Sequence, residues 1–445
     1  MDIISLLACF RPLVSAVTFR HFSLIMPAIL TMTGRVTMFG ISRWTEKGGS
    51  YRTVNRFFAT TLPWGELFMT FFETHIFDAS SEYILAGDAT TILKSGKQTH
   101  GIGRFFSGIQ SQVVKGLEFF VFSVVNVREG KAYPMASEQT VRSEAEKAVV
   151  KTKPKKRGKK PLGRPKGSLN KDKKQLELSP ELLRINSLLS KTLKLLRRFV
   201  KLEYLALDGH FAHNQAVLMT VSNGLELISK LRKDAALCEI YEGEYGGIGR
   251  KAEYGKRLDY ENLPQKYWKK AKREGEIITN YLNGIFVHRN FGMKLNVVII
   301  ERINVNTKKI GTAILFSSDL ELGWEKLLRY YSLRFQIEFN FRDAKQHFGL
   351  EDFMNTTKSG VENAANLALM MVNVSAKLLK TGEAKCVGIG DLKTHFRGVK
   401  YALLAIKILH EKAETILMKE TIEEIKQKLS KFGCIHKSKV AHFTP

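Results

Sequence analysis

The chain has 445 residues, of which 44% are hydrophobic, so it can bury a sizeable core and a wholly disordered protein is excluded. Its length favours two to four structural units. The 70 Lys and Arg outnumber the 43 Asp and Glu and give a net charge of +27, which favours a polyanion such as nucleic acid as partner. The four cysteines form no CxxC pair, which excludes a zinc ribbon and a disulfide framework and fits a reducing compartment.

The first 75 residues carry apolar side chains at helical spacing, so we expect them to form helices. No uncharged apolar run reaches about 18 residues, so we expect no membrane span. The stretch that begins at Ser50 predicts a capped helix with Arg52 and Arg56 four residues apart on one face. That face is either a DNA-binding surface or an ordinary solvated one, and the sequence leaves both open.

Hydrophobic, β-branched runs at 83–94 and 117–126 predict two strands of a covered sheet. Between Lys151 and Lys174 there are twelve Lys or Arg and one acid, which predicts a flexible basic loop. The next segments predict a helix, a strand, a helix and a strand, at about 180–200, 204–208, 214–224 and 225–231. This order indicates an α/β layer architecture.

Residues 232–322 differ in character and predict a mainly β module inserted into the α/β domain. Two strand patterns stand out in it, at 295–303 and 310–317. After the module, residues 323–349 predict one long helix. Further helices are expected at about 359–380 and 397–432.

Two aspartates lie within or at the end of hydrophobic strands. Asp88 comes directly after Gly87 within one strand, and Asp208 ends another, before Gly209. A lone Asp in such a place is more often a turn former or a helix cap than a catalyst. An open α/β sheet, however, binds ligands at the carboxyl ends of its strands, so a functional role is the alternative.

The long helix carries a polar stripe with the spacing Y-x(2)-R-x(3)-E-x(6)-K, made of Tyr331, Arg334, Glu338 and Lys345. At about 100° per residue these four side chains fall within an arc of about 60°, beside an apolar face. The ordinary interpretation is a salt-bridged helix edge, since Arg334 and Glu338 are an i,i+4 pair. Asp343 lies off the stripe, so Glu338 is the better third acid.

With the two preceding aspartates, this spacing resembles the Tyr-Arg-Glu-Lys subgroup of bacterial DDE transposases, the cut-and-paste enzymes of insertion sequences. The segments 337–346 and 392–401 are also similar to the family, and the resemblance runs from about 30 to 405. It implies an α/β fold: a ribonuclease-H-like catalytic core with a β-rich insertion, plus helical N- and C-terminal regions. The spacing of 130 residues from Asp208 to Glu338 leaves room for that insertion.

The implied organisation has a helical DNA-binding region, a core in two parts around the insertion, and a helical C-terminal region. The basic loop belongs to the first part of the core. In chain order, the boundaries are 1–75, 76–231 (with the loop at 151–174), 232–322, 323–380 and 381–445.

The resemblance also implies the chemistry. Asp88, Asp208 and Glu338 would be the catalytic residues and would hold two Mg²⁺ ions, with Mn²⁺ as a substitute. Two such ions activate the attacking oxygen and relieve charge on the leaving oxygen of a phosphodiester. Metal-dependent cleavage at terminal inverted repeats and strand transfer into target DNA would follow.

Further residues are expected to contact DNA. Tyr331, Arg334 and Lys345 would grip the phosphate of the transposon end while that end passes through a hairpin. Arg342 lies on the same helix and joins this DNA-binding group. A flipped base would need an aromatic partner, for which Trp268 and Trp324 are candidates, although a structural role is the ordinary one for each. 

The basic loop contains Gly163-Arg164-Pro165-Lys166-Gly167, which resembles an AT-hook core that binds the minor groove. The alternative is a nonspecific phosphate-binding loop, and both interpretations assign DNA contact to Arg164 and Lys166.

The expected partners are double-stranded DNA, both transposon ends and target, and a second copy of the chain, because synapsis requires two ends. No P-loop occurs, so ATP is not expected. We expect a soluble protein of the bacterial cytoplasm, associated with the nucleoid. Two alternatives stay open: a non-catalytic DNA-binding repressor derived from such an element, and a ribonuclease-H-like nuclease without strand transfer.

Overall fold

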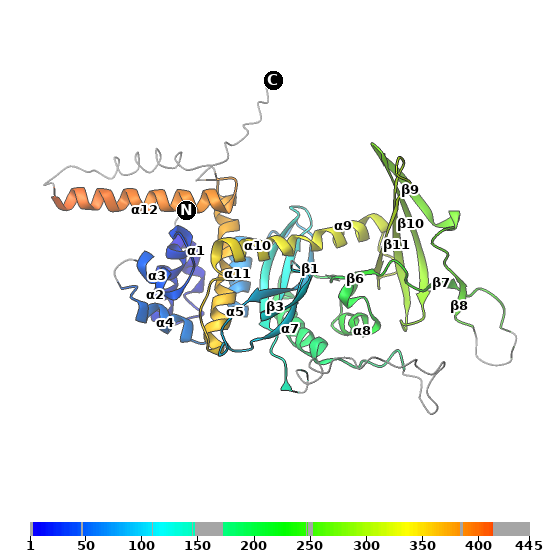
Figure 1. The fold of residues 1–445 in the computed structure, drawn as a ribbon, viewed down its shortest axis with the longest axis horizontal. Coiled ribbons are helices and arrows are strands. Elements are labelled where there is room, and N and C mark those ends of the chain that lie inside the picture. The colour runs from blue at the N-terminus through cyan, green and yellow to red at the C-terminus, as the bar shows by residue number, and fades with distance from the viewer. Residues whose placement is uncertain are drawn as a thin grey trace, which may run out of the picture.

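The computed structural model of the protein describes residues 3–45, 48–108, 110–144, 146, 172–245, 247, 252–382 and 386–412. Within them, helices gather at one end of the molecule, a sheet crosses its middle, and long hairpins project at the other end (Figure 1). The basic loop expected at 151–174 lies almost entirely outside the described residues, and so do Arg164 and Lys166.

The helices expected at the N-terminal end are confirmed. They are α1 (Ile3–Leu7), the 3-10 helix η1 (Ala8–Phe10), α2 (Ala16–Thr31), α3 (Met38–Trp44), α4 (Tyr51–Ala59) and α5 (Trp64–His75). In their core, the ring of Phe22 meets Phe57 and Trp64 edge-on, with centroids 5.0 and 6.0 Å away. The predicted cap is also present, because the Ser50 hydroxyl accepts a hydrogen bond from the amide of Thr53 at the start of α4.

The strands of the described chain belong to one sheet of 12 strands. They are β1 (Tyr83–Leu93), β2 (Gly103–Ser107), β3 (Gln112–Asn126), β4 (Lys131–Gln139), β5 (Tyr204–Ala206), β6 (Glu226–Leu231), β7 (Leu237–Ile240), β8 (Tyr254–Arg257), β9 (Trp268–Glu274), β10 (Ile277–His288), β11 (Lys294–Asn304) and β12 (Ile310–Ser317). Their order is β2-β3-β1-β5-β6-β12-β11-β10-β7-β8, with β4 beside β3 and β9 beside β10. The α/β class is therefore confirmed.

The sheet is mostly antiparallel, with parallel pairing in its middle. β1 is antiparallel to β3 but parallel to β5, and β5 is parallel to β6. β12 joins β6 in antiparallel register, from Ile314 opposite Leu231 to Ser317 opposite Ile228. The strands of the expected insertion thus continue the same sheet rather than forming a sheet of their own.

The expected strands at 83–94, 117–126 and 204–208 correspond to β1, β3 and β5. The two strand patterns in the insertion are β11 and β12. Two strands of the central region, β2 and β4, were not predicted.

Helices cover both faces of the central sheet. They are α7 (Pro180–Leu196), α8 (Asn214–Ser222), α9 (Trp324–Arg334) and α10 (Gln336–Phe348). Ile84 and Ala86 of β1 share an apolar cluster with Leu327 and Tyr330 of α9, whereas Leu85 belongs to the cluster that contains the buried side chains of α7. Because side chains alternate along a strand, the even-numbered positions of β1 near Ala86 face α9.

The prediction of one helix at 323–349 is wrong, because α9 and α10 are two helices that meet at Phe335. At this point the backbone tightens: the amide of Phe335 bonds to the carbonyl of Ser332, and the amide of Glu338 bonds to the carbonyl of Phe335. Both bonds span three residues, as in a 3-10 turn. No Pro or Gly in this stretch announces the break.

The helix expected at 359–380 is confirmed as α11 (Lys358–Lys380). The last helix was expected from residue 397, but α12 (Ile389–Lys412) begins a full two turns earlier. In its first turn, the Asp391 carboxylate accepts a hydrogen bond from the amide of Val387, which lies just before the helix. The expected continuation at 413–432 lies outside the described residues. None of the described helices combines the length and apolar character needed to cross a membrane.

Asn363 of α11 fastens the N-terminal helices to the rest of the chain. Its side chain amide donates hydrogen bonds to the carbonyls of Phe58 and Thr60, at 2.9 and 2.7 Å, where α4 ends. Its carbonyl oxygen accepts from the Trp64 indole, at 2.8 Å, where α5 begins. Asn363 is only 2% exposed, and an amide is well suited here because it donates and accepts at once.

Replacing Asn363 by Leu would leave the Trp64 N–H and two carbonyls without partners in the interior. Each unsatisfied group costs about 1–3 kcal/mol, so we expect the free energy of unfolding to fall by about 3–5 kcal/mol in urea denaturation followed by tryptophan fluorescence. The matched control Glu362→Gln changes an exposed neighbour and should shift it by less than about 0.5 kcal/mol. Equal effects of the two substitutions would contradict this role.

Candidate active site

Asp88 and Asp208 occupy matching positions on neighbouring strands. Ala86 of β1 is opposite Ala206 of β5 in the parallel register, and each aspartate lies two residues further along its own chain. Two residues restore the same side of a strand, so Asp88 faces α9, as Ala86 does. The sheet therefore delivers two acids that are 120 residues apart in sequence to one place.

Gly87 leaves room here for side chains that pack against β1. A Cβ atom added to it would lie 2.8 Å from Leu207 Cδ2 and 2.9 Å from Phe122 Cε1, closer than real contacts allow. Leu207 directly precedes Asp208, so a side chain at position 87 would press on the segment that carries the second acid.

Asp208 also has the ordinary role of a helix cap, which was one interpretation of the sequence. It precedes the 3-10 helix η2 (Gly209–Phe211), and its carboxylate accepts a hydrogen bond from the amide of His210, at 3.2 Å. The Asp208 backbone carbonyl accepts from the Ser229 hydroxyl of β6, at 2.7 Å. The helix-cap interpretation is thus confirmed for Asp208, and it leaves the second carboxylate oxygen for other partners.

Arg334 connects the acids of β1 and α10. Its Nη1 donates to Asp88 Oδ2 at 2.7 Å, and its Nη2 lies 3.4 Å from Glu338 Oε1. The Arg334 side chain is only 12% exposed, and its guanidinium carbon lies 5.9 Å from the centre of the Tyr331 ring. Three side chains from two distant segments of sequence, Asp88 from one and Tyr331 and Glu338 from the other, therefore meet around the Arg334 guanidinium, with Asp208 nearby.

The electrostatics of the site reflect this crowding. Burial raises the pKa of the Asp88 carboxyl, Arg334 opposes that rise, and the neighbouring charge of Asp208 adds to it. Burial likewise raises the pKa of the Tyr331 phenol, again opposed by Arg334 and reinforced by the two aspartates. The site thus contains like charges in a place that disfavours them, and it is stabilised by positive charge.

The other predicted residues of the long helix lie apart from this cluster. Lys345 donates to the Thr91 carbonyl at 2.9 Å, three residues beyond Asp88 on β1, and pairs with Glu351 at 3.1 Å. Arg342 binds Asp343, at 2.9 Å.

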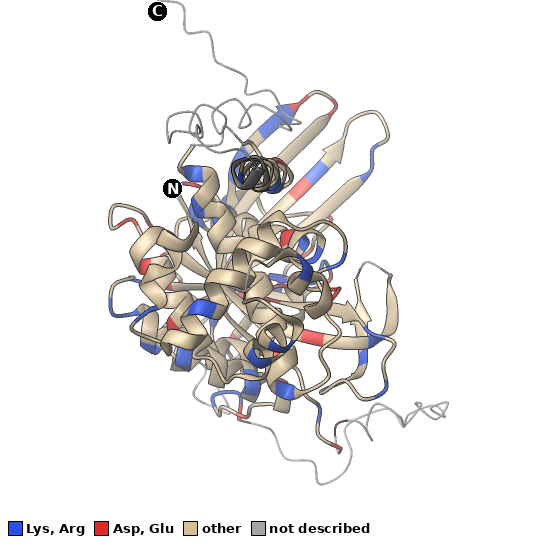
Figure 2. Ribbon diagram, turned by 90° about the vertical axis from the view of Figure 1, so that its left-hand side faces the viewer, with Lys and Arg blue, Asp and Glu red and all other residues tan. Residues whose placement is uncertain are grey.

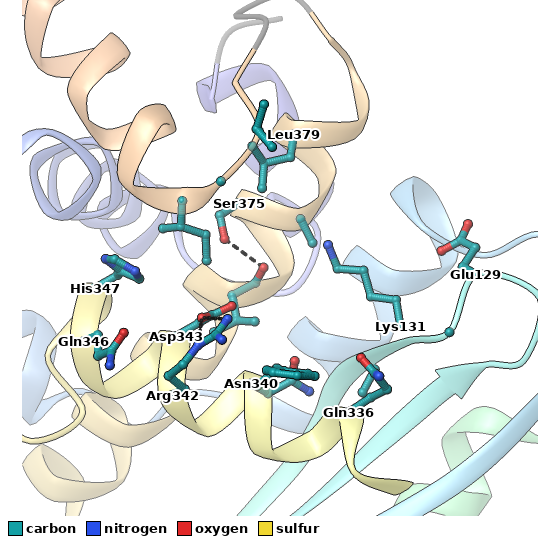
Figure 3. Close-up of a pocket in the computed structure, with 18 residues that line it drawn as sticks. Glu129, Lys131, Gln336, Asn340, Arg342, Asp343, Gln346, His347, Ser375 and Leu379 are labelled. Atoms are coloured by element: carbon teal, nitrogen blue, oxygen red, sulfur yellow. Dashed lines mark hydrogen bonds and ion pairs between the residues drawn. The ribbon is translucent and has the colours of Figure 1, made fainter. Parts of the chain in front are cut away.

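Arg342 and Asp343 line a cavity of about 470 Å³ together with Lys131 and His347, shown in Figure 3. Asp88 and Asp208 are not among the residues that line this cavity. Asp343 therefore faces a different place from the two aspartates and is a poorer candidate than Glu338 for the third acid of the site. Arg52 and Arg56 are exposed on α4, at the helical end that faces the viewer in Figure 2, and their role in DNA binding stays a prediction.

Two exposed aromatic residues close in sequence to Arg334 and Glu338 were missed by sequence reasoning. Phe335 is 49% exposed at the junction of α9 and α10, and Phe339, 38% exposed, meets it edge-on with centroids 5.5 Å apart. Their spacing of four on a polar helix was the available signal. Of the predicted aromatics, Trp324 packs against Tyr281, and Trp268 is exposed on β9, in the projecting hairpins.

The acids match a divalent ion in chemistry, because Mg²⁺ prefers carboxylate oxygens and two of the acids lie at neighbouring strands. Within the described residues, however, no three His, Cys, Asp or Glu side chains are close enough together to hold a metal ion. The guanidinium of Arg334 stands between Asp88 and Glu338 instead. A shared metal site of the three acids stays a prediction.

The Asp208→Asn substitution should lower the pKa of Asp88. It removes the like charge that helps to raise this pKa, while burial and Arg334 are unchanged. The measurement is a carboxyl ¹³C NMR titration of Asp88. The control Asp259→Asn changes an exposed acid of the insertion and should leave the pKa of Asp88 unchanged. If the pKa of Asp88 is also unchanged in Asp208→Asn, the two carboxyls do not interact.

The comparison with known families gives a match over much of the chain. The family model described as DDE superfamily endonuclease matches residues 8–280, more than half of the chain. The match includes Asp88 and Asp208 and ends before Glu338. None of the curated proteins matches the chain. Members of this family act on DNA and generally use divalent metal ions, and the chain belongs to the DDE superfamily of endonucleases.

Proposed function

We propose that the protein is a DNA transposase of the Tyr-Arg-Glu-Lys subgroup, which cuts DNA at the terminal inverted repeats of its element and joins the ends to target DNA. One observation carries the proposal: Arg334 contacts both Asp88 and Glu338, beside Asp208. Members of the motif that are far apart in sequence are thereby gathered at one half-buried place. An ordinary salt-bridged helix edge would not include an aspartate of β1.

The proposed fold of the catalytic part is a ribonuclease-H-like core made of β4, β3, β1, β5 and β6. Three antiparallel strands followed by two parallel ones support it, as do the helices on both faces. The acids support it as well, because they lie where the parallel pairing of β1 and β5 ends. The strands from β7 to β12 are the proposed insertion.

Asp88, Asp208 and Glu338 would hold two Mg²⁺ ions, which supply a more acidic attacking water and charge relief at the leaving oxygen. The tasks of the chain itself are to bind and orient DNA. Arg334 presents a planar fork to phosphate oxygens, and Tyr331 lies against it. 

Other parts of the surface would hold the rest of the DNA. Phe335 is the proposed stacking partner of a flipped base, because it is 49% exposed and directly follows Arg334 in the chain. Lys345 sits further along β1 and would contact a neighbouring phosphate. Lys and Arg recur over the helical end and on the projecting hairpins (Figure 2). A homodimer would bring two DNA ends together.

The substitutions Asp88→Asn, Asp208→Asn and Glu338→Gln should each reduce cleavage by on the order of 10³-fold or more. When catalytic residues act together, removing one of them costs nearly as much activity as removing all of them. The measurement is nicking of a duplex from the DNA that flanks the coding sequence, in Mg²⁺ or Mn²⁺. Binding of that duplex should persist. Asp343→Asn is the matched control and should keep its activity; full cleavage by any of the other three would remove that residue from the site.

The two alternatives differ from the proposal in their products. We expect the wild-type protein to join the 3′ ends of the cut duplex to a supercoiled plasmid, which is detected as labelled plasmid on a gel. Cleavage without joined product would indicate a nuclease without strand transfer. Binding without any cleavage would indicate a repressor.

A further inference from the structure

We propose that Arg334 is an internal counterion that blocks metal binding at Asp88 in the DNA-free protein, and that a DNA phosphate removes it. This inference rests on the proposed function and concerns the regulation of the same site. Arg334 would then have two alternative sets of partners: carboxylates when DNA is absent, and phosphate oxygens when DNA is present.

The geometry supports exclusion between the guanidinium and a metal ion. Arg334 Nη1 lies 2.7 Å from Asp88 Oδ2. Mg²⁺ binds a carboxylate oxygen at about 2.0–2.1 Å, so an ion on the same oxygen would crowd the guanidinium and be repelled by its charge. The contact with Glu338 Oε1, at 3.4 Å, keeps the third acid turned to the same cation.

In the DNA-free state, the negative charge of the aspartates holds the Arg334 guanidinium at the site. Asp88 is half-buried and next to the like charge of Asp208, so it needs a cation nearby. The guanidinium meets this need from within the chain.

One hydrogen-bond donor of the Arg334 guanidinium is unsatisfied, which favours an exchange of its carboxylate partners for a phosphate. Its Nε is buried and has no hydrogen-bond partner in the described part of the chain. A phosphate accepts two parallel hydrogen bonds from a guanidinium, one of which Nε can supply. A phosphate would therefore satisfy donors that the two carboxylates do not, and would also cancel the charge.

The consequence is coupling between DNA and metal. If a phosphate draws Arg334 away, Asp88 and Glu338 are released together, and an ion can bind between them. By linkage, DNA then raises metal affinity and metal raises DNA affinity by the same factor. Cleavage chemistry would be assembled only on bound DNA.

The test measures Mn²⁺ binding to the full-length protein without DNA, by electron paramagnetic resonance of free Mn²⁺. Arg334→Gln should bind Mn²⁺ more tightly than wild type, by a factor in the usual range of coupled sites, about 5- to 150-fold. The matched control is Arg329→Gln, which makes the same change of charge on α9 but donates to the Val127 carbonyl rather than to the acids. It should bind Mn²⁺ as wild type does.

Two further measurements make the result specific. The gain should vanish in the double variant Asp88→Asn with Arg334→Gln, and Arg334→Lys, which keeps a positive charge, should fall between wild type and Arg334→Gln. Adding the flanking-DNA duplex should raise the Mn²⁺ affinity of wild type more than that of Arg334→Gln. Thermal unfolding by circular dichroism confirms that each variant is folded.

Equal Mn²⁺ affinity of wild type and Arg334→Gln, or a gain that survives Asp88→Asn, would overturn the proposal. These outcomes are separate from those of the proposed function. A wild-type protein that cuts and joins DNA but binds Mn²⁺ as tightly as Arg334→Gln refutes only the counterion. A protein that cuts no DNA refutes the transposase, while the titration still decides the counterion.

Discussion

The constraint on which the site depends is the placement of two carboxylates on neighbouring parallel strands. The register that sets Ala86 opposite Ala206 also brings Asp88 and Asp208 together, two residues further along. Gly87, next to Asp88, leaves room for the side chains of Leu207 and Phe122. Like charges held in a half-buried place require a cation, and the chain supplies one from α9. The position of α9 over the sheet is thus tied to the chemistry of the acids as well as to its own apolar contacts.

Helix α11 links the parts of the molecule around this pair of acids. α11 is buried along most of its length and contacts the N-terminal helices, the sheet and α10. Asn363 fixes it to the ends of α4 and α5 through three groups at once. The candidate DNA-binding helices are therefore connected to α10, which carries Glu338, through one buried helix.

Much of the fold could be predicted from the sequence, because hydrophobic periodicity specifies most helices and the buried strands. β1, β3, β5, β11 and β12 are continuous apolar runs of this kind. β4 was missed because its sequence is mixed and contains Pro134, which sits where the register with β3 shifts. The break at Phe335 was missed because no helix breaker marks it. Local patterns also misplace the start of α12.

For the site, the sequence indicated which side chains to consider but not how they pair. The stripe of Tyr331, Arg334 and Glu338 is a property of local helix geometry, and the i,i+4 contact follows from it. The contact between Arg334 and Asp88 spans 246 residues and depends on how α9 lies over the sheet, which no local pattern contains. The same holds for Phe335, whose exposure follows from the position of the helix junction.

The junction at Phe335 has a mechanical consequence. Arg334 is the last residue of α9, which packs over the strands that continue into the projecting hairpins, while Glu338 lies in the first turn of α10, which packs on α11. A tightened turn between two helices is a natural pivot. Any change in the angle between the two helices would therefore alter the distance between the Arg334 guanidinium and the Glu338 carboxylate, which is 3.4 Å in this structure.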